Sequence, residues 1–374
     1  MGLAPDSHSQ VTPERHVALF IPHLDFGGSE LQLFALARNL PPRGFRPIVV
    51  TIERRHGVAE MFQAQGIEVV ALPRRGRAGL DSVLALARLI RERDIRLVHS
   101  WLWAANWRAA LAGLLAPVPV VFAVRGLEDD LGLAHSLAYR PLSSRASRII
   151  ANSEAIVERS VQRTGRPDLY RIVRNGIDVA ALERAAGTRA APGAPVVGYL
   201  GSLSSRKRVE SLAPIAEMVL REIPSARFLV VGGGDSRETL VAACRRLGVE
   251  SSFDLAGQQA DVGRWLARMT VLIHPSMSEG RSNSLLEAQA LGVPVAAYDI
   301  AGNREAVLPG ETGVLVRDGD ERALAAAIVE LLRDPARLGA LAARGRAFVR
   351  ERFSIDVMVD DTAEVYRAAL SGAP

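Results

Sequence analysis

Short apolar runs alternate with helical patterns along most of the chain, and this alternation limits the folds that the sequence can adopt. The strand-like runs are residues 16–21, 46–52, 67–72, 95–100, 118–124 and 146–152 in the first half, and 196–201, 227–234, 252–257, 270–276, 293–299 and 312–318 in the second. Intervening stretches such as Ser29–Leu40 and Leu80–Arg93 carry apolar residues at spacings of three and four, as amphipathic helices do. Strands that alternate with helices form parallel sheets, so the sequence predicts an α/β fold with doubly wound sheets.

A segment of small residues, Pro and Gly at 181–195 separates the two sets of strands, and we expect it to be a linker. A chain of 374 residues suits two domains of roughly 150–200 residues each. We therefore predict two Rossmann-like domains that face each other across a cleft, one over residues 1–180 and one over 195–356. The final helical pattern, at about 357–374, is expected to pack on the first domain. Ligands of such sheets bind beyond the carboxyl ends of the strands, which places the site in the cleft.

The positive charge of the chain is concentrated in its first half. Residues 1–178 contain 23 arginines against 17 acidic residues, whereas residues 179–374 contain 23 basic and 24 acidic residues. A basic half suits an anionic partner such as a phosphorylated substrate or a membrane surface, but an arginine-rich composition can equally reflect coding bias and solvated faces. The chain lacks both zinc-finger spacing and the aromatic-and-basic interleaving of single-strand binders, so we expect no nucleic-acid partner.

The cysteine content and the lengths of the apolar runs indicate the cellular compartment of the protein. Cys244 is the only cysteine, which is typical of a reducing compartment. We find no signal peptide and no run near the roughly 18 apolar residues that a membrane span needs. We expect a cytoplasmic protein, with a peripheral position on the inner face of the membrane as an open alternative.

The first candidate loop, "PHLDFGGSELQLFALA" at 22–37, follows a strand and opens a helix. Gly27 and Gly28 would let backbone N–H groups approach a ligand, and the N-terminus of a helix attracts phosphate. Two adjacent glycines also suit a plain strand-to-helix turn, so this loop decides nothing by itself.

The second candidate loop, "GSLSSRKRVE" at 201–210, holds Lys207, the only lysine in the chain. Arg206 and Lys207 lie just past a strand, where cations could stabilise the charge that develops on a diphosphate leaving group. Lysine supplies a compact point charge, whereas arginine supplies a planar fork. In isolation, a three-residue basic run is more typical of a solvated face.

The third candidate segment, "SMSEGRSNSLLEAQALGVPVAAYD" at 276–299, carries two glutamates eight residues apart, Glu279 and Glu287. We expect a helix to begin between them, with the backbone N–H groups of Ser282, Asn283 and Ser284 forming an anion site at its N-terminus. Carboxylates on either side of such a site are good acceptors for sugar hydroxyls. Glu287 could also be an ordinary glutamate of a first helical turn.

The fourth candidate is Arg125, which follows a strand in "VFAVRGLEDD" and would face the expected cleft. It could contact a phosphate or an acceptor, or it could be a surface residue. A metal is not expected. The string "DGD" at 318–320 is formally a metal-binding pattern, but Asp320 is better placed to cap the helix that begins near Glu321. Since no His or Cys cluster has ligand spacing, we expect neither a metal nor a cofactor.

Seven short segments, each ordinary by itself, occur in one order along roughly residues 16–370. They are "GGSE" (27–30), "NSEAI" (152–156), "VRNGID" (173–178), "GSLSSRKR" (201–208), "VVGGG" (230–234), "HPSMSEGRSNSLLEAQALGVPV" (274–295) and "ETGVLV" (311–316). In this order they resemble the family 4 glycosyltransferases, retaining enzymes of the GT-B fold that use nucleotide-sugar donors. Glu279 and Glu287 match the E-x7-E motif of that family, in which seven residues separate two glutamates.

The resemblance implies a role for each matching residue. Glu279 and the backbone that follows it would hold the donor sugar, and Glu287 would accept hydrogen bonds from the ribose hydroxyls. Lys207, with Arg206 nearby, would hold the diphosphate. The other donor-binding positions would be Gly27, Gly28, Ser202, Gly233, Gly257, Gln258, Gly280, Arg281, Ser282, Asn283 and Ser284.

Two positions depart from the pattern of that family. Ser202 stands where the family often has an arginine, so phosphate binding would depend on Lys207 and one of its neighbours. Arg125 ends a strand where many members have a histidine. Because arginine cannot act as a base at neutral pH, a role for Arg125 would be to stabilise charge.

The sequence thus predicts a retaining glycosyltransferase that moves a hexosyl group from a nucleotide diphosphate sugar to a sugar, lipid-linked or glycan acceptor with an α-linkage, in the synthesis of cell-surface glycans or glycolipids. The candidate catalytic residues are Glu279, Lys207, Arg206 and Arg125. Two alternatives stay open: a nucleotide-sugar epimerase or hydrolase of the same architecture, and a non-catalytic nucleotide-sugar-binding protein.

Overall fold

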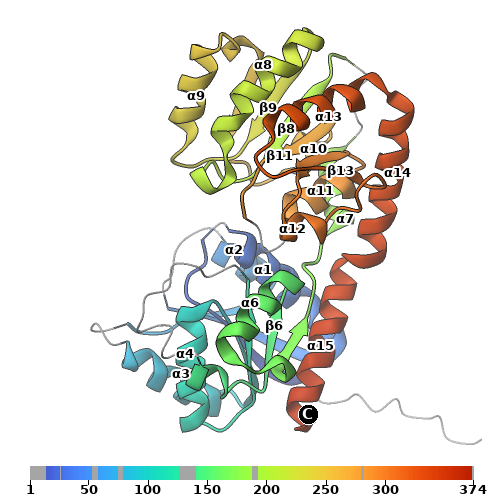
Figure 1. Ribbon diagram of the computed structural model, residues 1–374. Coiled ribbons are helices and arrows are strands. Elements are labelled where there is room, and N and C mark those ends of the chain that lie inside the picture. Colours follow the sequence, from blue (N-terminus) through green and yellow to red (C-terminus); the bar gives the residue numbers. More distant parts are fainter. Residues whose placement is uncertain are drawn as a thin grey trace, which may run out of the picture.

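The computed structural model describes residues 14–25, 27–52, 58–74, 79–125, 140–187, 193–278 and 282–372. Their strands form two parallel sheets, which lie in the lower and the upper part of Figure 1. The first sheet, in the order β3-β2-β1-β4-β5-β6-β7, contains β1 (Arg15–Ile21), β2 (Phe45–Thr51), β3 (Glu68–Ala71), β4 (Ile95–Trp101), β5 (Val120–Val124), β6 (Arg148–Ala151) and β7 (Tyr170–Ile172). The second, in the order β10-β9-β8-β11-β12-β13, contains β8 (Val196–Leu200), β9 (Arg227–Val231), β10 (Phe253–Gly257), β11 (Val271–His274), β12 (Val295–Tyr298) and β13 (Gly313–Val316).

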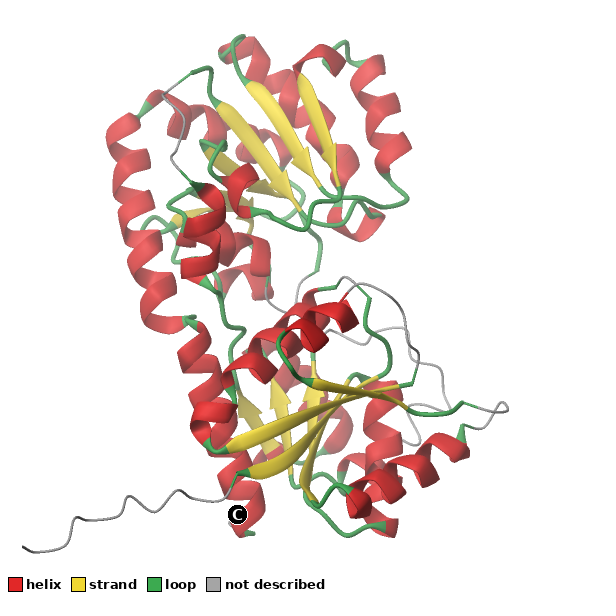
Figure 2. Cartoon of the chain, turned by 180° about the vertical axis from the view of Figure 1, so that it is seen from behind, coloured by secondary structure: helices red, strands yellow, loops and turns green. Residues whose placement is uncertain are grey.

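Helices follow the strands and lie on both sides of each sheet (Figure 2). Those that precede the second sheet in the chain are α1 (Gly28–Asn39), α2 (Val58–Ala64), α3 (Leu80–Glu92), α4 (Trp103–Leu115), α6 (Glu154–Thr164) and α7 (Val179–Ala186). Those of the second half are α8 (Leu212–Glu222), α9 (Arg237–Arg246), α10 (Gly263–Leu266), α11 (Asn283–Ala290), α12 (Ala301–Arg304), α13 (Glu321–Arg333), α14 (Pro335–Arg352) and α15 (Ile355–Ser371). Within the ranges given above, no helix combines the length and the apolar character needed to cross a membrane.

The strands of the first sheet are buried on both faces, which is why they appear in the sequence as continuous apolar runs. Along β1, Ala18 and Phe20 belong to one hydrophobic cluster, and Val17, Leu19 and Ile21 belong to another. Helices α3, α4 and α6 cover the first of these faces, whereas α1, α2 and α15 cover the second. The last helix of the chain therefore completes the core of the first sheet (Figure 1).

The chain passes between the two sheets twice, at residues 173–178 and between α14 and α15, and these two segments lie side by side. The backbone N–H of Ile177, which follows the first sheet, donates to the carbonyl of Phe353 at the end of α14, at 2.7 Å. Gly176 makes this approach possible, because a Cβ there would lie 2.9 Å from the Cα of Ile355. Gln32 of α1 holds the same segment, since its side-chain amide donates to the carbonyl of Gly176 at 2.8 Å and accepts from its N–H at 2.9 Å.

The predicted fold class is confirmed, because both halves form doubly wound parallel sheets. Strand β7 was not expected, since three residues are too few to show a periodicity; it forms by pairing with β6. The expected linker at 181–195 is helical in its first part. There α7 packs on α10 so closely that a Cβ on Gly263 would lie 2.6 Å from the carbonyl oxygen of Leu182. Small residues allow this close packing, and the sequence pattern alone does not distinguish it from a flexible linker.

Replacing Gly176 with alanine should destabilise the packing of α15 on the first sheet. The added methyl group would press on the Cα of Ile355 at 2.9 Å and on the Cβ of Met358 at 3.1 Å, and overpacking of this kind costs about 1–3 kcal/mol. Gly193→Ala is the matched control, because a Cβ at Gly193 meets nothing within 4 Å. Denaturation curves should show a lower free energy of unfolding for Gly176→Ala only. Equal stability of the two variants would contradict the close crossing.

Candidate active site

The order of the strands reverses between β1 and β4 in the first sheet and between β8 and β11 in the second. Ligands of doubly wound sheets bind beyond the carboxyl ends of the strands at such reversals. The four candidate loops follow β1, β5, β8 and β11, which lie at or next to these points. The order of the strands thus brings together segments that are far apart in the sequence.

Backbone contacts join the loops after β8 and β9. Gly232 and Gly234 have φ angles of 149° and 147°. A Cβ on Gly232 would lie 1.8 Å from the carbonyl oxygen of Gly201, and one on Gly234 would lie 2.3 Å from that of Leu203. The N–H of Leu203 donates to the carbonyl of Gly233 at 2.9 Å. Side chains at Gly232 and Gly234 would separate the two loops, so the contact between these loops is made by backbone.

Four of the expected donor-binding residues, Ser202, Gly233, Gly257 and Gln258, lie in the loops after β8, β9 and β10. Gly233 faces the loop after β10, because a Cβ on it would lie 3.5 Å from the Cβ of Gln258. Gly257, with φ of 71°, ends β10 and starts the turn that carries Gln258. Ser202 is exposed, and its carbonyl accepts a hydrogen bond from the hydroxyl of Tyr199 at 2.8 Å. The structure therefore places these residues at the carboxyl ends of neighbouring strands.

One arginine of the basic run at 206–208, Arg208, has its partners within the second half of the chain. Arg208 donates to Asp318 at 2.6 Å, and its guanidinium carbon lies 5.6 Å from the ring centre of Tyr298. Asp320 accepts from the N–H of Ala323 at 2.9 Å and caps α13, as expected for this aspartate. Both aspartates of the "DGD" string thus have structural partners.

Lys207 and Arg206 lie in the turn that follows β8. Arg206 is exposed and Lys207 is half-buried. The carbonyl of Arg206 accepts from the N–H of Met277 at 3.1 Å, so this turn lies against the segment that leads to α11. Of the two arginines that flank Lys207, Arg206 is the one whose side chain remains exposed near that segment.

Within the part of the chain that the structure describes, no side chain caps the N-terminus of α11. Ser282 occupies the N-cap position without accepting a hydrogen bond from the first turn, and its hydroxyl lies 2.9 Å from that of Ser284. The N–H groups of the first turn therefore keep their capacity to bind an anion, and the helix dipole favours negative charge there. Glu279, Gly280 and Arg281, which precede this helix, lie outside the described residues.

Glu287 lies one turn inside α11 and is half-buried. Burial raises the pKa of its carboxyl to about 7. A carboxylate that has lost part of its hydration gains strongly from hydroxyl donors, because they replace the missing water. Glu287 is thus suited to accept hydrogen bonds from a polyhydroxylated ligand.

The loop after β1 meets the N-terminus of α11. Gly27 is the N-cap of α1, and a Cβ on Gly28 would lie 3.7 Å from the Nδ2 of Asn283. Behind this turn, the Oε1 of the buried Glu30 lies 3.2 Å from the Nδ1 of His23. Burial raises the pKa of the Glu30 carboxyl. Gly28 and Asn283 come from different halves of the chain, so the two halves face each other at this point.

The side chain of Asn175 joins the two halves, and the sequence did not indicate this. Its Oδ1 accepts from Arg125 at 2.8 Å and from Asn152 at 3.4 Å, while its Nδ2 donates to the Oδ1 of Asn283 at 2.6 Å. Asn175 is buried on the crossing segment 173–178. The available signal was the "VRNGID" segment, to which we attached no function.

Arg125, at the end of β5, stacks on a tryptophan. Its guanidinium carbon lies 4.0 Å from the ring centre of Trp101. Burial lowers the pKa of Arg125 to about 10, which still leaves it protonated at neutral pH. Next to Trp101, the Nδ1 of His99 lies 2.7 Å from the hydroxyl of Tyr366. Burial, and then the charge of Arg125, lower the pKa of His99 well below its usual value, so this histidine is neutral.

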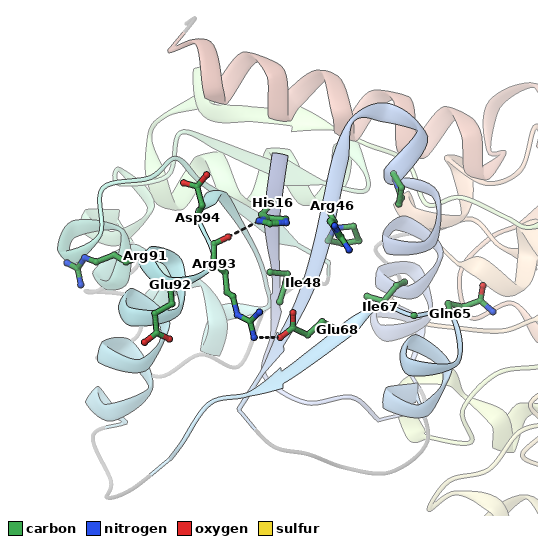
Figure 3. A pocket seen from close by; sticks show the side chains of 13 residues that line it. His16, Arg46, Ile48, Gln65, Ile67, Glu68, Arg91, Glu92, Arg93 and Asp94 are labelled. Atoms are coloured by element: carbon green, nitrogen blue, oxygen red, sulfur yellow. Dashed lines mark hydrogen bonds and ion pairs between the residues drawn. The ribbon is translucent and has the colours of Figure 1, made fainter. Parts of the chain in front are cut away.

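A pocket at the opposite edge of the first sheet does not belong to this site (Figure 3). His16, Arg46 and Glu68, near the amino ends of β1, β2 and β3, help to line it. Glu68 pairs with Arg93 at 2.8 Å, and the Nδ1 of His16 lies 2.8 Å from the carbonyl oxygen of Arg93. Since ligands of such sheets bind at the carboxyl ends, we assign this pocket no role.

Both halves of the chain match known protein families. The profile described as "Glycosyltransferase Family 4" matches residues 26–181, and that described as "Glycosyl transferases group 1" matches residues 194–334. The chain belongs to glycosyltransferase family 4. It is therefore an enzyme that transfers glycosyl groups.

The glycosyltransferase has relatives of known type. It is 28% identical over 375 residues to a D-inositol 3-phosphate glycosyltransferase of Thermobispora bispora, which covers 92% of this chain and 86% of that protein. It is 29% identical over 299 residues to a GDP-mannose-dependent monoacylated alpha-(1-6)-phosphatidylinositol monomannoside mannosyltransferase of Corynebacterium glutamicum, which covers 73% of this chain and 77% of that protein.

Solved structures confirm the GT-B fold of the glycosyltransferase. It is similar to Anabaena HepE in complex with UDP, with a TM-score of 0.83 at 22% identity over 94% of this chain and 100% of that chain. It is also similar to the sucrose-phosphate synthase of Thermosynechococcus elongatus, with a TM-score of 0.79 at 21% identity over 96% of this chain and 100% of that chain.

Replacing Glu287 with glutamine should stabilise the protein at pH 8 and have little effect at pH 4. Because the pKa of Glu287 is raised to about 7 by folding, the unfolded chain loses this proton first, and stability falls as the pH rises from about 4.5 to 7. Glutamine has no such proton, so the variant escapes this fall. Partial exposure to solvent limits the gain at pH 8 to about 1–3 kcal/mol. Thermal melts of both proteins at the two pH values measure the effect, and a difference independent of pH would contradict it.

Proposed function

We propose that this glycosyltransferase retains the anomeric configuration and transfers a hexosyl group from a nucleotide diphosphate sugar to a sugar, lipid-linked or glycan acceptor, forming an α-linkage. The observation that carries the proposal is the meeting of three elements that suit a diphosphate: the uncapped N-terminus of α11, the turn that holds Lys207, and the turn at Gly27 and Gly28. Each offers positive charge or backbone N–H donors to an anion.

The donor would lie on the loops of the second sheet. Arg206 and Lys207 would hold the diphosphate together with the backbone N–H groups of Ser282, Asn283 and Ser284. Glu287 would accept from the ribose hydroxyls, which fits a carboxylate whose burial is otherwise uncompensated. The nucleotide would border Ser202, Gly233, Gly257 and Gln258, and the donor sugar would lie against Glu279, Gly280 and Arg281.

The transfer would take place on one face of the donor sugar. The bond between the anomeric carbon and the diphosphate oxygen breaks, and the acceptor oxygen forms a new bond to that carbon. The proton of the acceptor hydroxyl moves to the departing diphosphate. Lys207, Arg206 and the N-terminus of α11 stabilise the charge that develops on the diphosphate. Arg125 stays protonated, so it contributes charge and does not relay a proton.

We further propose that the acceptor and the donor bind to different domains. Residues 1–180, with the helix near 357–374, would bind the acceptor, and residues 195–356 would bind the donor. The packing of α15 in the core of the first sheet supports this division.

The acceptor would be anionic or lipid-linked. The names of the two relatives, which refer to D-inositol 3-phosphate and to a phosphatidylinositol mannoside, and the basic character of residues 1–178 support this class. A peripheral position on the cytoplasmic face of an anionic membrane would suit such a substrate. Exposed leucines on α3 and α4 support it, namely Leu80, Leu84, Leu114 and Leu115.

Replacing Lys207 with alanine should lower kcat by about 100-fold or more, because a cation that stabilises the leaving diphosphate is removed. A thermal-shift screen against UDP-, GDP- and ADP-sugars identifies the donor for this assay. Arg245→Ala is the matched control, since this exposed arginine of α9 pairs only locally, with Glu250 at 2.9 Å. Near-wild-type turnover of Lys207→Ala would overturn the assignment of the site.

Transfer should continue unchanged in the presence of EDTA. Among the described residues, no three His, Cys, Asp or Glu side chains are grouped as a metal site requires, and the cations proposed above would take the place of a metal at the diphosphate. Loss of activity in EDTA that added magnesium restores would refute this.

Incubation with the donor alone separates the proposal from its alternatives. Little free or epimerised sugar should form without an acceptor, and the product formed with one should be α-configured by NMR. Rapid hydrolysis or epimerisation would favour those activities, and tight donor binding without turnover would favour a binding protein.

A further inference from the structure

A row of three hydrogen-bonded side chains runs from the end of β5 to the start of α11. We infer that its first two members, Arg125 and Asn175, are positioning residues that set the direction of the third, the Asn283 amide, so that its N–H donors face the diphosphate. The inference rests on the proposed function, because it assumes that an anion binds at the N-terminus of α11.

The direction of the row is fixed at its first member. A guanidinium group can only donate hydrogen bonds, and Arg125 stays protonated at neutral pH. Its NH1 lies 2.8 Å from the side-chain amide of Asn175, so the atom that faces it has to be the oxygen. The nitrogen of the same amide then faces Asn283 at 2.6 Å and has to meet an oxygen there.

The consequence appears at the far end of the row. With the Oδ1 of Asn283 bound to Asn175, its Nδ2 is directed elsewhere, and it lies 3.7 Å from the position that a Cβ on Gly28 would take. An anion bound between Gly28 and the first turn of α11 would thus meet amide hydrogens. If the amide were reversed, the same anion would meet oxygen lone pairs and be repelled.

An arginine suits the first position better than a histidine would. A neutral histidine can donate or accept at a given ring nitrogen according to its tautomer, so it would leave the direction of the row undetermined. Stacking on Trp101 at 4.0 Å holds the partly buried guanidinium in place. Arg125 thus sets the direction of the Asn283 amide through Asn175.

The test uses Asn175→Asp, in which both side-chain oxygens accept. Arg125 can still donate to the new carboxylate, but Asn283 has to turn its Nδ2 toward it and its oxygen toward the diphosphate. We expect the Kd for UDP or GDP, whichever stabilises the wild-type protein, to rise by about tenfold or more in calorimetric titrations. Asn175→Ala leaves the Asn283 amide free to turn either way, so it should raise the Kd by only about two- to threefold.

Which of these two variants has the higher Kd decides between a positioning role and a merely structural role of Asn175. If Asn175 only joined the two halves, Asn175→Asp would be the milder change, because it keeps a partner for Arg125 and gains an ion pair. That order would overturn the inference. Asn39→Ala is the matched control, because the Nδ2 of Asn39 donates only locally, to the carbonyl of Ala35 at 2.8 Å. Melting temperatures confirm that each variant is folded.

Direct repulsion by the new negative charge has to be separated from reversal of the amide. In an Asn283→Ala background, Asn175→Asp should have little further effect on the Kd, since no amide remains to be turned. A second tenfold loss in that background would attribute the effect to charge and overturn the inference.

Substitutions of Arg125 complete the test. Arg125→Lys keeps an obligatory donor and should retain most of the affinity, whereas Arg125→Met should resemble Asn175→Ala. Equal losses in both would overturn the inference. If the wild-type protein bound neither UDP nor GDP, the proposed function itself would fail, whereas wild-type binding with an unaffected Asn175→Asp variant would overturn the inference alone.

Discussion

The hydrogen bond from Asn175 to Asn283 is the contact on which the geometry of the site depends. It ties the segment that leaves the first sheet to the first residue of α11 in the second half. The same segment is also held by α1, since the side chain of Gln32 binds the N–H and the carbonyl of Gly176. A buried hydrogen bond adds only about 1 kcal/mol of net stability, but leaving its polar groups without partners costs more. The N-terminus of α11 is therefore kept in register with the loops of the first sheet.

The chemistry that this geometry supports is mainly electrostatic. In the proposed site, the N-terminus of α11, the cation of Lys207 and the exposed guanidinium of Arg206 would all stabilise negative charge. Two of the groups on the side of the first sheet, Arg125 and His99, are poor proton acceptors. Arg125 is protonated, and His99 is buried next to it with its Nδ1 at the hydroxyl of Tyr366. This distribution fits a reaction in which the leaving group itself takes up the proton.

The sequence predicted those parts of the fold and site that depend on local patterns. Buried parallel strands have to be apolar on both faces, so the alternation of runs revealed both sheets. Asp320 precedes a helix and was expected to cap it, and it does. The candidate loops could be found because ligands of doubly wound sheets bind where strands end. The GT-B architecture followed from the order of the motifs.

Features that depend on distant contacts could not be predicted. Asn175 acquires its role from Arg125 and Asn283, which lie 50 and 108 residues away in the sequence. The sequence also left open which arginine would act with Lys207 in the proposed site. Arg208 donates to Asp318, 110 residues away, and this contact favours Arg206 for the proposed role. Hydrogen bonds over such separations leave no periodic trace in a single sequence.

The most direct test of this account is a crystal structure of the protein with bound UDP or GDP. The diphosphate should lie at the N-terminus of α11, with the Nδ2 of Asn283 and the ammonium group of Lys207 each within about 3.2 Å of a phosphate oxygen. The Oδ1 of Asn283 should still accept from Asn175. A diphosphate bound away from α11, or an Asn283 side chain turned away from Asn175 in the complex, would contradict the account.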